Sequence, residues 1–207
     1  MHILITNDDG VQSPGLLALA QTMASLGQVT VFAPDRNWSA AGHNKTIHKP
    51  LRVDEVRLED GALALTSNGT PSDCVAMAVL GVIEKHIDLV VSGINQGANL
   101  GQDITYSGTI AGAMEAAING LPAIAVSLAS YEVGADFHAA AEAARAVATT
   151  TIEEDLPQDT FLNVNVPSLP LAEMQGVCMT RLGQRVYRDV LLRREDPRGR
   201  PYYWIGG

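Results

Sequence analysis

The sequence is poor in cysteine and in basic residues. Its two cysteines, Cys74 and Cys178, lie far apart and form no Cys-x-x-Cys spacing or His/Cys cluster. A disulfide framework and a zinc site are therefore not indicated, and we expect both cysteines to be buried free thiols. The 14 Lys and Arg residues are outnumbered by 23 Asp and Glu, which gives a net charge of −9 without a long basic run. We therefore expect no binding to a nucleic-acid duplex.

Long hydrophobic runs are also missing. No apolar run approaches the roughly 20 residues that a transmembrane helix needs. The first residues lead almost at once to Asp8, without the basic region and apolar core of a signal peptide. We therefore expect no membrane association and a cytoplasmic location. With 207 residues, 46% of them hydrophobic, and no internal repeat, the chain is expected to form one globular domain.

Short apolar runs alternate with helical patterns along most of the chain. We predict strands at residues 2–6, 29–33, 88–92, 123–127 and 160–166. We predict helices at residues 15–26, 74–84, 108–119 and 136–154. Gly27 is the expected C-cap of the first helix. This order requires right-handed crossovers that place helices on both faces of a mostly parallel sheet, so the predicted fold is α/β with three layers.

Two regions depart from this alternation. Residues 51–66 alternate around Glu59-Asp60-Gly61, which predicts a β-hairpin as an excursion beside the main sheet. Beyond residue 175, the segments 177–182, 185–193 and 200–205 are typical of strands with charged, exposed faces. Such a tail could pair with a second subunit, because edge strands tend to be covered or used. We therefore expect a catalytic core at 1–175 and a β-rich oligomerisation arm at 176–207 of the same domain.

Polar clusters follow several of the predicted strands. In open α/β sheets, ligands bind outside the carboxyl ends of the strands, so each such cluster is a candidate site. The clusters are Asn7-Asp8-Asp9-Gly10, Pro34 to Ser39, Ser92 to Gly97, and Tyr106 to Thr109 at a helix start.

The acidic pair Asp8-Asp9 predicts a cation. Adjacent carboxylates repel and raise one another's pKa unless a cation or hydrogen-bond donors offset them, and a hard divalent ion is the natural partner. An Asp after a strand is also a common helix N-cap, so a capping role for the pair stays open. The Gly and Asn that flank the pair favour the cation site.

The Gly-rich segment 93–101 and the following helix start could bind phosphate. Its regularly spaced glycines, with Asn95 and Asn99 between them, allow close approach of backbone to a ligand. Ser107-Gly108-Thr109 would add free N–H groups at a helix start, which favour phosphate. The alternatives are a tight strand-to-helix connection and a plain Ser or Thr cap. Neither a P-loop nor a dinucleotide fingerprint is present.

Several other polar or aromatic residues carry a weaker signal. His43, His48 and His86 share no spacing and are interpreted as surface or loop residues. Lys45 and Arg36 could assist an anionic substrate or simply be solvated, and Trp38 is expected to pack under a loop more than to stack on a base.

Taken together, these motifs resemble the stationary-phase survival protein (SurE) family of nucleoside monophosphate phosphatases. The resemblance extends from end to end of the chain. Chains of that family usually continue past the stretch Tyr202 to Gly206, whereas this sequence ends at Gly207. The motifs that carry the resemblance are Ile5 to Val11, Ala33 to Asn37 with Ser39, Gly69 to Cys74, Val91 to Gly101, Tyr106 to Thr109, Asn163 to Pro167 and Asp196 to Gly199.

The resemblance implies a Rossmann-like core and hydrolysis of nucleoside 5′-monophosphates, with 3′-monophosphates and polyphosphate as substrates in some members. It implies one Mg²⁺ or Mn²⁺ ion per subunit and cytoplasmic homodimers or homotetramers that exchange C-terminal arms. The implied metal ligands are Asp8, Asp9, Ser39 and Asn95, of which Asp8 and Asp9 are also the catalytic residues. The expected substrate-binding residues are Asn99, Ser107, Gly108 and Thr109.

Two other functions would use some of the same motifs. A receiver-like signalling domain also has an acidic pair after its first strand, but it needs a phospho-accepting Asp and a Lys after later strands. Here the 88–92 strand ends in Ser92 to Asn95, and the 123–127 strand leads to no Lys. A non-catalytic nucleotide-binding module could keep the Gly-rich segment but has little use for the acidic pair.

Overall fold

A seven-stranded, mostly parallel sheet forms the centre of the molecule. The computed structural model describes residues 1–154, 156–184, 186 and 190–206. The strand order is β3-β4-β2-β1-β5-β6-β7, and all neighbouring pairs are parallel except β3 with β4. The strands are β1 (His2–Thr6), β2 (Gln28–Pro34), β3 (Val53–Arg57), β4 (Leu63–Ser67), β5 (Leu89–Gln96), β6 (Ala123–Ala129) and β7 (Leu162–Pro167).

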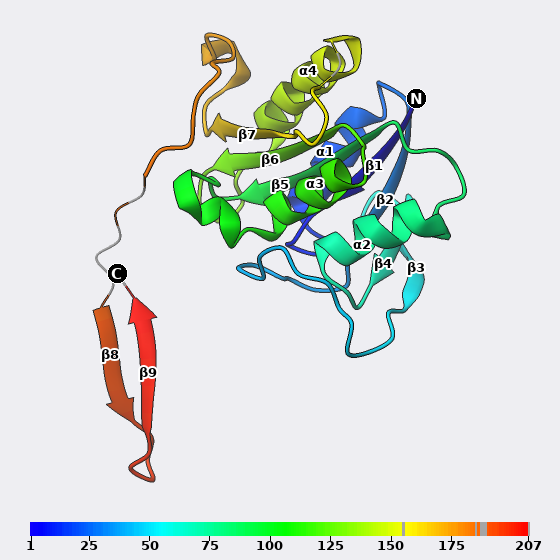
Figure 1. Cartoon of the computed structure of the whole chain (residues 1–207). Coiled ribbons are helices and arrows are strands. Elements are labelled where there is room, and N and C mark those ends of the chain that lie inside the picture. The colour runs from blue at the N-terminus through cyan, green and yellow to red at the C-terminus, as the bar shows by residue number, and fades with distance from the viewer. Residues whose placement is uncertain (155, 185, 187–189, 207) are drawn as a thin grey trace.

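Helices cover both faces of this sheet (Figure 1). One face packs against α1 (Pro14–Met23) and α4 (His138–Glu154), and the other against α2 (Pro71–Met77) and α3 (Gly108–Ile118). Each face has its own apolar core cluster. A π-helical turn, η1 (Ala78–Val82), and two 3₁₀ turns, η2 (Gly101–Thr105) and η3 (Leu171–Glu173), complete the elements of this part. The predicted three-layer α/β fold is confirmed.

The first helix ends earlier than predicted. It stops at Met23 with Ala24 as its C-cap, so the prediction that Gly27 caps it is wrong. Gly27 instead lies against the N-terminus, where an added Cβ would stand 2.5 Å from the Met1 carbonyl oxygen. The next residue donates its N–H to that same oxygen (Gln28 N to Met1 O, 3.0 Å). A glycine is therefore required there for close backbone approach.

The predicted hairpin and second helix both form, with differences in detail. Strands β3 and β4 pair on either side of the Asp60-Gly61 turn, and β4 also pairs with β2. The hairpin is therefore the edge of the main sheet and no separate excursion. The helix predicted at 74–84 begins earlier, at Pro71, because Thr70 and Asp73 form a reciprocal capping box.

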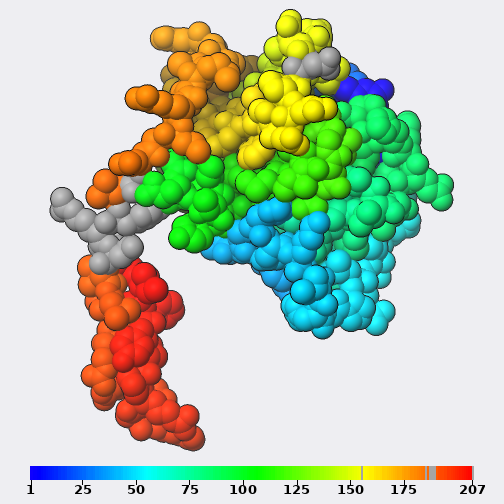
Figure 2. Space-filling view, viewed as in Figure 1, coloured from blue at the N-terminus to red at the C-terminus, as the bar shows by residue number. Residues whose placement is uncertain are grey.

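The C-terminal hairpin differs from the rest of the chain. Strands β8 (Val190–Glu195) and β9 (Pro201–Gly206) pair with each other, and every residue in them is exposed. Figure 2 shows this hairpin projecting from the body. The strand predicted at 177–182 does not form, and part of the one predicted at 185–193 lies outside the described residues.

The cysteines and the helices bear on two other predictions, buried thiols and no membrane association. Cys74 is buried as expected, whereas Cys178 is exposed, because it lies on the segment without helix or strand that leads to the hairpin. None of the described helices has the length and apolar character needed to cross a lipid bilayer.

Candidate functional site

The polar clusters predicted from the sequence meet at the carboxyl edge of the sheet. Strands β1, β2 and β5 are parallel neighbours, so their C-terminal ends lie at one edge. The backbone N–H of Trp38, just after β2, donates to the Asp8 carbonyl, just after β1, at 2.7 Å. The start of α3 reaches the same place, because the Thr109 hydroxyl donates to Asp8 Oδ1 at 2.5 Å.

Asp8 is the most enclosed member of this site, with 3% of its surface exposed. Burial raises the pKa of its carboxyl, while the Thr109 hydroxyl and the backbone amides of Gly108 and Thr109 act in the opposite direction. Asp8 therefore lies directly against the N-terminus of α3. That position favours a negative charge, because the helix dipole and the free N–H groups point at it.

Gly108 makes this close approach possible. A Cβ added at Gly108 would lie 2.6 Å from the Cβ of Asp8 and 2.9 Å from its Oδ2. No side chain fits in that space without moving the carboxylate. The glycine predicted to face phosphate thus has a second role, which is to admit Asp8 to the helix start.

Asp9 is more open than Asp8. Burial, and then the charge of Asp8, raise its pKa to about 6, while a hydrogen bond from the Gln96 backbone lowers it. Asn37 Nδ2 lies 3.3 Å from Asp9 Oδ1. Among the described residues, no Lys, Arg or His forms an ion pair with either carboxylate. The pair therefore carries negative charge that the described side chains do not neutralise.

Neither aspartate caps the helix that follows. The N-cap of α1 is Ser13, whose hydroxyl accepts the Leu16 N–H at 3.3 Å. Asn7 organises the turn between β1 and α1, because its amide nitrogen donates to Gly10 O at 3.2 Å and to Ser13 Oγ at 2.6 Å. The capping alternative left open by the sequence therefore does not apply to α1.

Asn95 and Ser39 are the two neutral residues expected at the metal. The amide nitrogen of Asn95 donates to Gly97 O at 2.7 Å, so its oxygen is the atom available to a cation. Ser39 is exposed, and its backbone N–H donates to Asn37 Oδ1 at 2.7 Å. Asn37 thus contacts both Ser39 and Asp9. It lies in a cluster that the sequence highlighted, but no role was predicted for it.

The chemistry of this donor set fits a hard divalent cation. Carboxylate, amide and hydroxyl oxygens are the ligands that Mg²⁺ and Mn²⁺ prefer, with waters completing the shell. The described residues contain no group of three or more His, Cys, Asp or Glu side chains able to hold a metal. Neutral oxygen donors or waters would therefore complete the shell beside the acidic pair, and Asn95 and Ser39 carry oxygens of that kind.

Asn99 is held from several sides. Its side chain is buried and donates to Ser127 Oγ at 2.8 Å. Asn165 binds its backbone twice, accepting the Asn99 N–H at 2.8 Å and donating to the Asn99 carbonyl at 3.0 Å. Asn163 donates to the same carbonyl at 3.0 Å. These two asparagines of β7 anchor the Gly-rich segment, a role that their sequence motif did not reveal.

The expected phosphate-binding residues at the start of α3 have partners within the chain. Ser107 is the N-cap, and its hydroxyl oxygen accepts the Ile110 N–H at 3.2 Å. The Thr109 hydroxyl is engaged with Asp8. Both readings of the sequence, a cap and a ligand site, are therefore compatible with this helix start. A phosphate contact by these residues stays a prediction.

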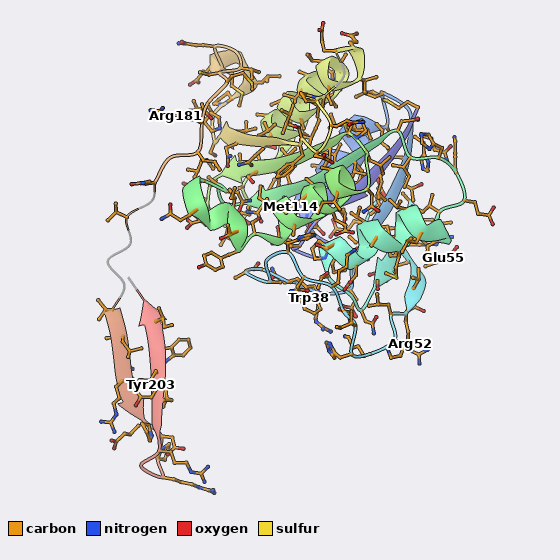
Figure 3. The ribbon with its side chains drawn as sticks, viewed as in Figure 1. Trp38, Arg52, Glu55, Met114, Arg181 and Tyr203 are labelled. Atoms are coloured by element: carbon orange, nitrogen blue, oxygen red, sulfur yellow. The ribbon has the colours of Figure 1, made fainter. Side chains whose placement is uncertain are left out.

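The packing of Trp38 under a loop stays a prediction. Trp38 is half-buried, and the Arg36 guanidinium lies 4.7 Å from the centroid of its ring. Arg36 also lies 3.8 Å from Asp35, with both side chains largely exposed. Figure 3 shows Trp38 on the loop that passes beside α3, which carries Met114.

Comparisons with known proteins find relatives that match all or most of the chain. A family model described as "Survival protein SurE" matches residues 3–189. The chain is 57% identical to a 5′-nucleotidase SurE of Herpetosiphon aurantiacus and 53% identical to that of Chloroflexus aggregans, covering all of this chain and 82% of each relative. The crystal structure of SurE from Aquifex aeolicus matches with a TM-score of 0.86 at 43% identity, over all of this chain and 82% of that one.

Proposed function

The chain belongs to the SurE family, and from this premise we propose that it is a metal-dependent 5′-nucleotidase that hydrolyses nucleoside 5′-monophosphates to nucleoside and phosphate. One observation carries the proposal. The buried Asp8 lies against the start of α3 beside the more open Asp9, and no described Lys, Arg or His forms an ion pair with either carboxylate. The relatives named 5′-nucleotidase SurE match over the whole chain, which supports the same activity.

Asp8, Asp9, Ser39 and Asn95 would hold one Mg²⁺ or Mn²⁺ ion. When bound, such an ion supplies a Lewis acid that polarises a phosphoryl oxygen and lowers the pKa of a coordinated water. Asp8 is enclosed and fixed by Thr109, which suits a ligand that must not move. Asp9 is more accessible than Asp8, which suits a group that orients the attacking water and accepts its proton.

The start of α3 would bind the phosphoryl group. Ser107, Gly108 and Thr109 stand at this helix start, where the helix dipole favours an anion. The Thr109 hydroxyl and the backbone amides of Gly108 and Thr109 also act on Asp8, so a phosphate would share these donors with that carboxylate. Asn99, on the anchored Gly-rich segment, would complete the substrate contacts.

The C-terminal arm would join subunits. In β8 and β9 the apolar residues are exposed, and a second copy of the chain could cover them. The chain would then form a homodimer or homotetramer, with residues 1–175 as the core and 176–207 as the exchanged arm. A cytoplasmic location is part of the same proposal. The exposed apolar residues of the hairpin are Val190, Leu191, Leu192, Tyr202, Tyr203, Trp204 and Ile205.

The two alternative functions are not favoured. A receiver-like domain needs a Lys after a later strand, and the segment that follows β6, Ser130 to Asp136, contains none. A non-catalytic nucleotide-binding module does not explain the acidic pair. Relatives named as nucleotidases match the whole chain, which weighs against both.

A nucleotide panel tests the proposed function. The protein is freed of metal with EDTA and then assayed for phosphate release from 5′- and 3′-monophosphates and from polyphosphate, with Mn²⁺, with Mg²⁺ and without metal. We expect release from 5′-monophosphates that requires one of the metals. Nucleotide binding without phosphate release under any condition would contradict the proposal and favour the binding module.

A further inference from the structure

The loop that carries Ser39 lacks regular secondary structure of its own. Residues 35–52, here called the Ser39 loop, form neither helix nor strand, and most of them are exposed. A metal ligand must nevertheless be held within a fraction of an ångström of its working position. The geometry of the proposed metal site therefore depends on what fixes this loop to the body.

A buried glutamate of α3 makes the charged contact with the loop. Glu115 is 1% exposed, and its Oε1 lies 2.8 Å from Lys45 Nζ, while its Oε2 lies 2.9 Å from His43 Nε2. Asn119 Nδ2 lies 3.1 Å from the same Oε1. Both carboxylate oxygens are therefore engaged, and two of the three side-chain partners belong to the Ser39 loop.

This contact places a strong constraint on the loop. A buried carboxylate that loses its cationic partner is left with an uncompensated charge, which is far more costly than losing a surface ion pair. If His43 and Lys45 moved away from α3, the Glu115 carboxylate would lose its cationic partners, at a cost in free energy. The two loop residues are therefore held against the helix.

The same helix also holds Asp8. Gly108 and Thr109 contact Asp8 at the start of α3, and Glu115 follows about two turns later, roughly 10 Å along the axis. The loop also touches the residue before the helix cap, because Gly42 N donates to Tyr106 O at 2.9 Å. Helix α3 is thus a common frame for Asp8 and for the loop that carries Ser39, and Figure 3 shows the loop with Trp38 running beside it.

Other anchors hold the later part of the loop. The Thr70 hydroxyl donates to the Asn44 carbonyl at 3.1 Å, and Asp73 Oδ1 accepts the Thr46 N–H at 2.9 Å. Both of these contacts lead to α2. Loss of the Glu115 contact would therefore leave the stretch between Trp38 and Asn44, which includes Ser39, held to the start of α3 by the Gly42–Tyr106 hydrogen bond, while the rest of the loop and the fold remain.

We propose that Glu115 is a positioning residue for the metal site, which fixes Ser39 through His43 and Lys45. This inference rests on the proposed function, because it assumes that Ser39 and Asp8 share a cation. It adds a residue with no direct contact to metal or substrate, and it links two parts of the site that come from distant segments of the sequence.

The test is Mn²⁺ binding to the whole 207-residue chain in the absence of substrate, monitored through the EPR signal of free Mn²⁺. The variants are Lys45→Met, Glu115→Gln and the double variant, with Lys45→Arg as the conservative replacement. The matched control is Glu142→Gln on α4. In the wild type, the Glu142 carboxylate lies 2.7 Å from Arg145 on the same helix. Lys45 is largely exposed, so Lys45→Met carries the test even where Glu115→Gln folds poorly.

We expect Lys45→Met and Glu115→Gln each to raise the Mn²⁺ dissociation constant about tenfold, as outer-shell changes at metal sites do. The double variant should bind Mn²⁺ about as weakly as Glu115→Gln alone, because Glu115→Gln already removes the charged partner of Lys45. Lys45→Arg should restore most of the affinity, and Glu142→Gln should leave it unchanged. Turnover at saturating Mn²⁺ should stay within about twofold of wild type, since a positioning effect is overcome by excess metal.

Two results would overturn the inference. The first is a wild-type Mn²⁺ dissociation constant in folded Lys45→Met and Glu115→Gln proteins. The second is a lower melting temperature in these variants without any change in Mn²⁺ affinity. If the wild-type protein itself binds no Mn²⁺, the proposed function fails and this inference fails with it. Wild-type binding with unchanged variants contradicts the inference alone.

Discussion

The carboxyl edge of the sheet and the C-terminal hairpin place their side chains in opposite ways. At the edge, polar groups are buried and bonded, as Asp8 is to Thr109 and Asn99 is to Ser127. In the hairpin, large apolar groups such as Trp204 and Ile205 are exposed, at 63% and 80%. Each region therefore has an unfavourable contribution to its free energy that the described residues do not offset.

The difference shows what each region requires. The edge carries two carboxylates without a cationic partner among the described side chains, so it needs a positive ion. The hairpin carries apolar surface without cover, so it needs another protein surface. A small ligand would complete the first region and a second copy of the chain the second. A substitution in one region should therefore not alter the binding partner that the other region requires.

The largest effect is expected at Asp8. Asp8→Asn keeps the shape of the side chain and removes the charge, so the site should lose its metal, and phosphatase activity should fall by more than about 100-fold, beyond what outer-shell changes cause. Phosphate release at several Mn²⁺ concentrations measures this. Circular dichroism should show an unchanged fold. Near-normal turnover with excess metal would contradict the assignment.

Gly108→Ala should have the next largest effect. The added Cβ would meet the Cβ of Asp8 at 2.6 Å, so either the carboxylate or the start of α3 must move. We expect activity to fall about 10- to 100-fold. Gly183→Ala is the control, because no heavy atom lies within 4 Å of the Cβ it would add. Equal kinetic constants for the two variants would show that the packing of Gly108 on Asp8 is unimportant.

Trp204→Ser should change assembly more than chemistry. It removes a large exposed apolar side chain from β9, so we expect the molar mass measured by light scattering to shift toward smaller species. The Mn²⁺ requirement should remain. Val133→Ser on the body is the control, because Val133 is another exposed apolar side chain, at 104%. A shift in mass with both variants, or with neither, would remove the distinction between the two regions.

The smallest effect concerns Asp9 and pH. Folding raises the pKa of Asp9 from 3.8 to about 6, so the metal-free folded protein favours the protonated form. That contribution to stability is complete below pH 3.8 and is lost as the pH rises through about 6. Asp9→Asn should therefore raise the melting temperature of metal-free protein at pH 8 by about 2–4 °C, and by less at about pH 4.

Asp54→Asn provides the background for this pH comparison. Asp54 is exposed on the edge strand β3, so its replacement reports the loss of one surface carboxylate. Melting temperatures of both variants in EDTA are compared with wild type across the same pH series. A gain for Asp9→Asn that does not grow with pH would contradict the proposed destabilisation by the ionised pair.

Much of the fold could be predicted because local patterns determine it. Buried parallel strands such as β1 and β6 are short apolar runs ended by polar or turn residues. The end of α1 could not be predicted in the same way. Gly27 has the composition of a helix cap, but it lies against Met1, and that contact between distant backbones has no local signature.

The candidate site was predictable to the extent that its residues follow strands. Asp8 and Asp9 lie directly after β1, so their position at the sheet edge follows from topology. The partners of these residues were not predictable. Thr109, for which a phosphate contact is predicted, also bonds Asp8, and Glu115 lies in an Ala-rich helix and meets Lys45 from a distant loop. Such pairings depend on tertiary packing.

Calorimetry of Mn²⁺ binding tests the central claim most directly, because it needs neither a chosen substrate nor a turnover assay. Metal-free wild-type protein and Asp8→Asn are titrated side by side. We predict that one ion binds per wild-type chain and that this binding is absent from Asp8→Asn. Equal binding to both proteins, or no binding to the wild type, would contradict the claim that the carboxyl edge of the sheet is a metal site.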